Sequence, residues 1–119
     1  MSRDKPITKM VVADNCFITM EMQKLFFQIL DLSEHCDFCG DEDEFCEKIY
    51  NIIRLELLKP LNLQSYMPIC LILIDPDMDG GMRGIKAVKS IKTFYNEVNL
   101  SREMKLVEPH IVFVTSHSI

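Results

Sequence analysis

The sequence predicts an α/β fold in which a parallel β-sheet carries helices on both faces, and three observations support this fold. Short apolar runs alternate with longer segments of helical periodicity, in the order β-α-β-α-β-α-β. The run Ile69–Ile74 is uninterrupted and rich in β-branched residues, which is typical of a buried central strand. The chain has 119 residues, 48% of them hydrophobic, which is enough for the core of one domain over residues 1–119.

The predicted strands are short, and polar residues or glycine end them. Met10–Ala13 is a buried run that stops at Asp14, and His35–Cys39 is a weaker candidate that Gly40 ends. After the central run Ile69–Ile74, the last strand is predicted at Ile111–Val114. We therefore expect four parallel strands.

Three amphipathic helices are predicted between these strands. The first covers residues 17–30, and its apolar spacing predicts a packed face of Ile18, Met22, Leu25, Phe26 and Ile29. The second runs from a cap at Asp41, paired with Glu44, to about Leu58. The third presents an apolar face of Ile85, Val88, Ile91 and Tyr95, with its basic residues largely off that face, where we expect them to be solvated. Residues 59–68 and 96–109 are predicted as connecting loops.

Charge and composition limit the partners and the compartment. The formal net charge is −5 and the pI is near 5.1, which argues against a nucleic acid or an anionic membrane as a partner of this domain. No apolar run approaches the roughly 20 residues of a membrane span, and the N-terminus lacks the apolar core of a secretory signal. The expected location is the cytoplasm.

The cysteines are expected to be reduced and not to bind zinc. Their number, five, is odd, and the chain has a sizeable core, so a disulfide framework is not expected. The nearest approach to a zinc motif is His35, Cys36, Cys39 and Cys46, which lacks the second Cys-x-x-Cys pair of strong zinc signals.

Candidate functional residues follow three of the predicted strands. Ligands of open parallel sheets bind beyond the carboxyl ends of the strands, and here those ends lead to Asp14, Asp75 with Asp77, and Thr115. Carboxylates that converge there favour Mg²⁺, which prefers oxygen ligands, and a carboxylate beside Mg²⁺ can attack phosphorus. Taken singly, Asp14 could be only a helix cap and Thr115 only a strand residue.

Two other interpretations of Asp75–Gly80 were weighed. The D-x-D-x-D-G spacing matches the start of an EF-hand loop, but its twelfth position, where a bidentate Glu belongs, is Lys86, and an apolar strand precedes it. The segment also resembles phosphatases of the haloacid dehalogenase type, which place D-x-D after a strand and Thr or Ser after a later one. Those enzymes usually carry Thr or Val where this chain has Asp79.

Over almost its whole length, the chain resembles the receiver domains of two-component response regulators and hybrid histidine kinases. The segments that carry the resemblance are Val11–Asn15, Leu71–Met82 and Phe113–Ser116. It implies a flavodoxin-like fold with strand order 2-1-3-4, in which Asp75 accepts a phosphoryl group. It also implies that Asp14, Asp75 and the Asp77 carbonyl hold Mg²⁺ and that Thr115 binds the phosphoryl group.

The resemblance further implies the partners of the domain. These are a histidine kinase or a histidine phosphotransfer protein, and the domain can be part of a larger hybrid kinase. Docking in the family mostly involves the first helix and neighbouring loops, here Phe17–Met22. Such a domain is not an enzyme, except that it promotes its own phosphorylation and dephosphorylation.

Three departures from the family pattern qualify this prediction. Ala13 stands at the first position of the usual acidic pair, for which Asp77 or Asp79 could compensate. The turn after Asp75 lacks the usual proline and is one residue longer. The chain ends before the family's fifth strand, with its lysine, and the last helices, so we expect an incomplete domain with His110–Thr115 as an open sheet edge. The alternative is a degenerate receiver that only binds proteins.

Overall fold

A computed structural model describes residues 8–115 and contains a four-stranded, all-parallel sheet. The strand order is β2-β1-β3-β4, and the strands span Lys9–Ala13 (β1), Cys36–Cys39 (β2), Ile69–Ile74 (β3) and His110–Phe113 (β4). This confirms the predicted α/β class and the order 2-1-3-4 of a flavodoxin-like fold. The strand predicted at Ile111–Val114 begins and ends one residue earlier than expected.

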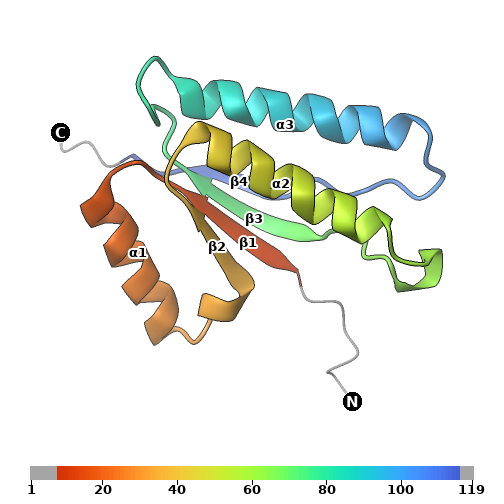
Figure 1. The fold of residues 1–119 in the computed structure, drawn as a ribbon, viewed down its shortest axis with the longest axis horizontal. Coiled ribbons are helices and arrows are strands. Elements are labelled where there is room, and N and C mark those ends of the chain that lie inside the picture. The colour runs from red at the N-terminus through yellow and green to blue at the C-terminus, as the bar shows by residue number, and fades with distance from the viewer. Residues whose placement is uncertain (1–7, 116–119) are drawn as a thin grey trace.

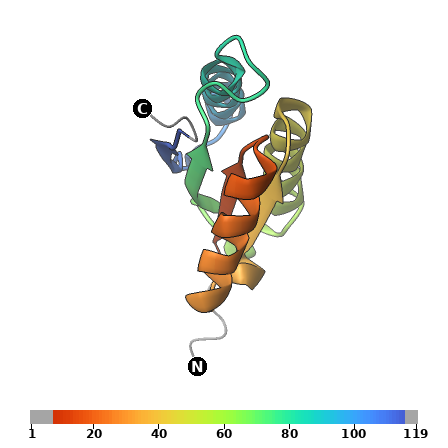
Figure 2. The same ribbon diagram turned by 90° about the vertical axis from the view of Figure 1, so that its left-hand side faces the viewer.

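Helices cover both faces of the sheet. They are α1 (Phe17–Ile29), α2 (Glu42–Leu57) and α3 (Arg83–Leu100). Figures 1 and 2 show α2 and α3 together on one side, with α1 apart from them. Helix α3 continues into the stretch 96–109 that was predicted as a loop, because Val98 still packs on the core one turn beyond Phe94. A single 3-10 turn, Leu61–Leu63, interrupts the predicted loop 59–68.

Two cores of unequal size hold these layers together. The larger lies between the sheet and the helices α2 and α3, and its buried side chains include Ile72, Ile74, Ile53 and Ile91. The smaller lies between the sheet and α1, and its buried residues are Val12, Met20, Phe27 and Cys36. Burial of apolar area on this scale is the main stabilising contribution to such a fold.

The predicted packed face of α1 is wrong. Met20 and Phe27 are the helix residues that face the sheet, whereas the predicted set is 56–71% exposed: Ile18, Met22, Leu25, Phe26 and Ile29. The helix is apolar on more than one side, and the sheet can contact only one of them. The larger apolar stripe therefore faces outward.

Helix α2 begins as predicted. The Asp41 side chain accepts the Glu44 N–H at 2.7 Å, and the Glu44 carboxylate in turn accepts the Gly40 N–H at 2.5 Å. The first bond satisfies one of the backbone donors that a helix start leaves without partners, and the second ties the residue before the cap to the first turn. Strand β4 lies at one edge of the sheet, as expected for residues 110–115. Within residues 8–115, no helix has the length and apolar character that a membrane crossing requires.

Candidate functional site

Two buried aspartates lie side by side at the carboxyl end of the sheet. Asp14 follows β1 and Asp75 follows β3, and the residues before them, Ala13 and Ile74, are paired in register. The Asp75 N–H donates to the Ala13 carbonyl at 3.1 Å, which fixes the two aspartates in adjacent positions. Only 2% of Asp14 and 4% of Asp75 is exposed. The structure thus brings together two of the predicted site residues.

Asp14 is incompletely satisfied in this environment. Its Oδ1 accepts the Cys16 N–H at 2.8 Å, while Oδ2 is buried and has no hydrogen-bond partner among the described residues. Burial raises the pKa of Asp14, the Cys16 N–H partly offsets this, and the charge of Asp75 raises the pKa further. Glu56 is the third buried acid in residues 8–115, and both of its carboxylate oxygens have partners. One accepts from Lys59 Nζ and the other from the Ser65 N–H.

The turn after β3 holds Asp75 and Asp77. Asp75 Oδ1 accepts the Asp77 N–H at 2.9 Å, and its carbonyl accepts the Met78 N–H at 3.2 Å. Asp77 Oδ1 accepts the Met82 N–H, and its carbonyl accepts the Gly80 N–H, both at 2.9 Å. The Asp77 carbonyl, predicted as a metal ligand, therefore already takes part in the turn and would have to accept a metal with its remaining lone pair.

Asp79 links this turn to the start of α2. It has a positive φ of 61°, its Oδ2 accepts the Glu42 N–H at 2.8 Å, and its Oδ1 lies 3.5 Å from Asn15 Nδ2. Both carboxylate oxygens of Asp79 therefore have partners at the edge of the site. The predicted role of Asp79 as a compensating acid for Ala13 stays a prediction. Ala13 itself is 1% exposed and belongs to the larger core.

Gly84 is a structural requirement of the site that the sequence analysis missed. A Cβ built on Gly84 would lie 1.9 Å from the Asp75 carbonyl oxygen, so the first turn of α3 can approach the end of β3 only without a side chain there. The Ile85 N–H donates to the Pro76 carbonyl at 3.2 Å across this approach. The available signal was a third glycine three residues after Gly81, at the start of the predicted third helix, where a glycine is unfavourable unless a close approach requires it.

Thr115 lies at the same edge of the sheet. Ile74 pairs with Phe113, and the Val114 N–H donates to the Ile74 carbonyl at 2.9 Å. Thr115 follows directly and is exposed. The topology therefore places the hydroxyl-bearing residue beside the strand end that leads into Asp75.

The structure also bears on the other metal sites considered. Cys36 belongs to the core against α1 and Cys39 to the core against α2 and α3, so these two thiols face opposite sides of the sheet and cannot chelate one ion. A strand rather than a helix precedes Asp75, unlike in an EF-hand. Within residues 8–115, no three His, Cys, Asp or Glu side chains form a group suited to a metal ion.

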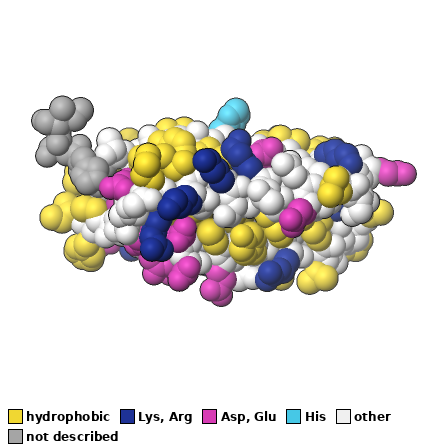
Figure 3. All heavy atoms as spheres, turned by 90° about the horizontal axis from the view of Figure 1, so that it is seen from above, with side chains coloured by type: hydrophobic (Ala, Val, Ile, Leu, Met, Phe, Trp, Pro, Cys, Tyr) yellow, Lys and Arg dark blue, Asp and Glu magenta, His cyan; other side chains and the backbone are white. Residues whose placement is uncertain are grey.

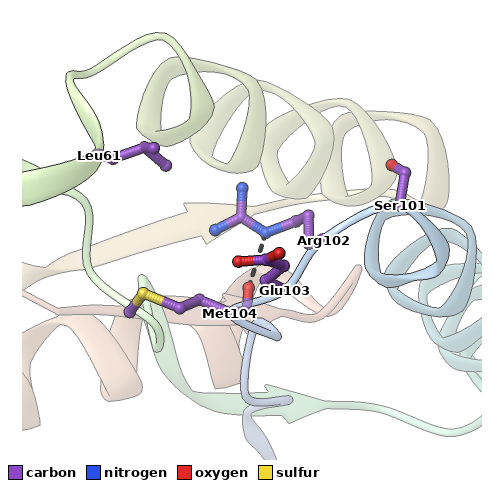
Figure 4. A pocket seen from close by; sticks show the side chains of 5 residues that line it. All are labelled: Leu61, Ser101, Arg102, Glu103 and Met104. Carbon is purple, nitrogen blue, oxygen red and sulfur yellow. Dashed lines mark hydrogen bonds between the residues drawn. The ribbon is translucent and has the colours of Figure 1, made fainter.

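A hollow at the opposite end of the sheet is structural. It measures about 420 Å³ and lies where the loop after α2 meets the loop after α3 (Figure 4). The guanidinium of Arg102 there donates to the Met104 carbonyl at 3.0 Å and to Gln64 Oε1 at 3.1 Å. The bond to Gln64 joins the two loops, so Arg102 has a structural role here.

The basic residues of α3 do not form a continuous patch. Arg83 lies 3.5 Å from Glu42, and Lys92 lies 3.8 Å from Glu108. Figure 3 shows basic side chains mixed with acidic and apolar ones on this side of the molecule. Such a mixed surface is typical of a solvated face.

Comparisons with protein families, with curated proteins and with solved structures found no match to this chain. Its function is therefore inferred from the site itself.

Proposed function

We propose that this chain is a phosphoacceptor domain of the receiver type, in which Asp75 accepts a phosphoryl group. The observation that carries the proposal is the buried pair Asp14 and Asp75 at adjacent strand ends, with one Asp14 oxygen that has no partner among the described residues. A protein that buries two carboxylates side by side needs a neutralising partner for them, a proton or a cation. The exposed Thr115 follows the neighbouring strand, and we expect its hydroxyl to contact the transferred group.

Asp14 and Asp75, which have no third ligating side chain grouped with them in residues 8–115, fit a divalent cation such as Mg²⁺ that keeps several water ligands. Asp14 and Asp75 supply hard oxygen ligands, and Asp14 Oδ2 is an acceptor that lacks a partner among residues 8–115. Asp14 and Asp75 would hold the ion, and the Asp77 carbonyl would contribute in addition to its bond with Gly80. Bound there, Mg²⁺ supplies charge neutralisation at the phosphoryl oxygens.

The proposed reaction is a single phosphoryl transfer from a phosphohistidine. A carboxylate oxygen of Asp75 attacks phosphorus, the O–P bond forms, the P–N bond to the imidazole breaks, and the imidazole nitrogen keeps that electron pair. The bond that Asp75 Oδ1 accepts from the Asp77 N–H orients the carboxylate for this attack. The product carries an added charge of about −1.5 to −2 before neutralisation by the cation.

The proposed donor is a histidine kinase or a histidine phosphotransfer protein. The first turns of α1 follow Asp14 directly, and Phe17 and Ile18 there are 75% and 70% exposed. An apolar surface beside the phosphoacceptor suits a protein partner that must bring its histidine to Asp75.

Incubation with acetyl phosphate and Mg²⁺, followed by intact-protein mass spectrometry, tests this proposal. We expect a mass increase of one phosphoryl group that Asp75→Asn abolishes and that Asp43→Asn, a control at an exposed acid on α2, retains. Absence of an Asp75-dependent adduct, or steady hydrolysis of acetyl phosphate without an adduct, would contradict it. The second result would instead favour a phosphatase.

The second candidate is a degenerate receiver that only binds proteins. The observation that favours it is Ala13, a buried methyl group at a position where the family carries an acid. Titration with Mg²⁺, followed by amide NMR shifts of residues 13–15 and 75–77, separates the two candidates. Saturation at millimolar Mg²⁺ supports phosphotransfer, and no response supports the degenerate module.

A further inference from the structure

The aspartate pair is closed to solvent. Asp14 is 2% exposed and Asp75 4% exposed, and Asp14 Oδ2 is buried. A cation has to reach that oxygen, and a phosphohistidine has to bring its phosphorus to about 3–3.5 Å from a carboxylate oxygen of Asp75 before the transfer. Neither group can enter unless part of the protein moves. The proposed function therefore requires an element that opens.

Residues Asp79–Met82, in the turn between β3 and α3, form a strap with a strained backbone. All four are exposed and have a positive φ, between 58° and 78°. The two central residues are glycines, which adopt this conformation readily, whereas side chains make it unfavourable for Asp79 and Met82. Such a backbone persists only where contacts hold it. Loss of those contacts therefore favours release of the strap.

One side chain holds the strap across three strand ends. Asp79 follows β3, its Oδ2 accepts the Glu42 N–H after β2 at 2.8 Å, and its Oδ1 lies 3.5 Å from Asn15 Nδ2 after β1. Figure 1 shows this turn beside the start of α2. Because β1 lies between β2 and β3, the Asp79 side chain crosses the edge of the sheet at which Asp14 and Asp75 are buried.

Other connections at this edge are held by the backbone. The Asp14 N–H donates to the Cys39 carbonyl at 3.1 Å, and the close approach at Gly84 fixes α3 against the end of β3. The strap is joined to α2 by Asp79 and, directly after the strap, by the ion pair of Arg83 at 3.5 Å. Exposed ion pairs contribute little, so the Asp79 bond is the main link.

We propose that the strap Asp79–Met82 is a lid over the aspartate pair, and that release of Asp79 from the start of α2 opens the pair to the cation and the phosphoryl donor. The inference rests on the proposed function, which requires both ligands to enter. The closed form is then in equilibrium with a minor open form. The rate of phosphorylation is proportional to the open fraction.

The rate of phosphorylation by acetyl phosphate and Mg²⁺ tests the lid. Asp79→Gly removes the side chain that holds the strap and keeps a residue that accepts a positive φ. The initial rate of Asp75 phosphorylation should rise at least about fivefold, the factor that corresponds to one lost hydrogen bond. Asp31→Gly is the matched control, because Asp31 is also exposed and has a φ of 59°, and it should leave the rate unchanged. An unchanged or lower rate in Asp79→Gly would overturn the lid.

Amide hydrogen exchange measures the opening without phosphorylation. The Met82 N–H lies at the far end of the strap from Asp79 and donates to Asp77 Oδ1 at 2.9 Å. If the strap opens as a unit, Asp79→Gly should speed exchange of the Met82 amide at least about fivefold, although it removes no bond of that amide. The Glu44 amide, which the cap of α2 holds, should exchange as in the wild type. Unchanged exchange at Met82 would overturn the lid.

The two measurements separate the lid from the proposed function. Faster exchange at Met82 in Asp79→Gly, with no Asp75 adduct in either protein, would support the opening of the strap and contradict the phosphoacceptor. An Asp75 adduct that forms at equal rates in both proteins would do the reverse. If Asp79→Gly disturbs folding, Asp79→Asn replaces it, because asparagine tolerates a positive φ and loses only the charge of the acceptor. Asp79→Asn should speed both processes by a smaller factor, and no change in either would overturn the lid.

Discussion

At the scale of single residues, the site depends on a buried acid, Asp14, one oxygen of which has no hydrogen-bond partner among the described residues. Glu56 shows how this chain satisfies a buried carboxylate for structural purposes, with a bond to each oxygen. Asp14 has a bond to one oxygen only, and its neighbour is a second acid. Leaving a buried acceptor unsatisfied costs about 1–3 kcal/mol of stability. We interpret this cost as the consequence of leaving Asp14 Oδ2 available to bind a cation or a proton.

Asp14→Asn should therefore stabilise the protein without metal at pH 7, by about 1 kcal/mol. The asparagine keeps the bond from the Cys16 N–H and removes a charge next to Asp75. Because the fold raises the pKa of Asp14 above 3.8, the folded state binds more protons than the unfolded state just above that pH. The contribution of Asp14 to the free energy of unfolding therefore falls as the pH rises through this window. Below about pH 4, where the Asp14 carboxyl is protonated in both states, Asp14→Asn should be no more stable than the wild type. Urea unfolding at several pH values measures this.

Glu47→Gln on the exposed side of α2 is the control for the loss of one acidic group. It should shift the unfolding free energy by less than about 0.5 kcal/mol at every pH. If Asp14→Asn proved less stable than the wild type at pH 7 in the absence of divalent ions, the account of an uncompensated carboxylate would be refuted.

Gly84→Ala should be among the most damaging single substitutions in the chain. The added Cβ would meet the Asp75 carbonyl oxygen at 1.9 Å, so either α3 or the end of β3 must move. We expect a loss of at least about 2 kcal/mol, at the upper part of the range for overpacking. Gly40→Ala is the matched control, because its nearest atom is the end of a side chain at 3.8 Å. Equal unfolding free energies for the two variants would contradict the close approach of α3.

At the scale of elements, α2 shows how local chemistry fixes a helix start. Asp41→Ala removes the side-chain acceptor of the Glu44 N–H and should cost about 1 kcal/mol. Asp43→Ala removes a charge from the same first turn but no capping bond, so the difference between the two variants isolates the cap from the helix dipole. Thermal or urea unfolding of both variants measures it. If Asp43→Ala lowered the free energy of unfolding more than Asp41→Ala, the charge in the first turn would stabilise the start of α2 more than the capping hydrogen bond does.

The elements also show what could be predicted from sequence and what could not. Strand β3 was predicted to the residue, because a continuous apolar run rich in isoleucine, between Pro68 and Asp75, has few alternatives. The packed face of α1 was predicted wrongly, because periodicity identifies an apolar stripe but not the neighbour that covers it. The contact between Gly84 and Asp75 was missed because it joins two elements whose approach only the fold determines. The adjacency of Asp14 and Asp75 followed correctly from topology alone.

At the scale of the whole molecule, the sheet is covered unequally. Two helices cover one face, one helix covers half of the other, and β4 is an edge strand in the described part of the chain (Figure 2). Open edges and uncovered faces lead to association. Within residues 8–115, the side opposite to α2 and α3 is therefore the one most prone to association.

If two chains associate through that side, the melting temperature should depend on protein concentration. Association of folded chains stabilises them by mass action, so a hundredfold rise in concentration above the dissociation constant adds about 2–3 kcal/mol per dimer. We expect the melting temperature of the wild type to rise by several degrees between about 2 and 200 µM. Phe26→Asp, at an exposed position, should melt near the wild-type value at low concentration and show no such rise, whereas Leu55→Asp should behave like the wild type. Differential scanning calorimetry or fluorimetry measures this, and a concentration-independent wild type would show that α1 remains uncovered in the isolated chain.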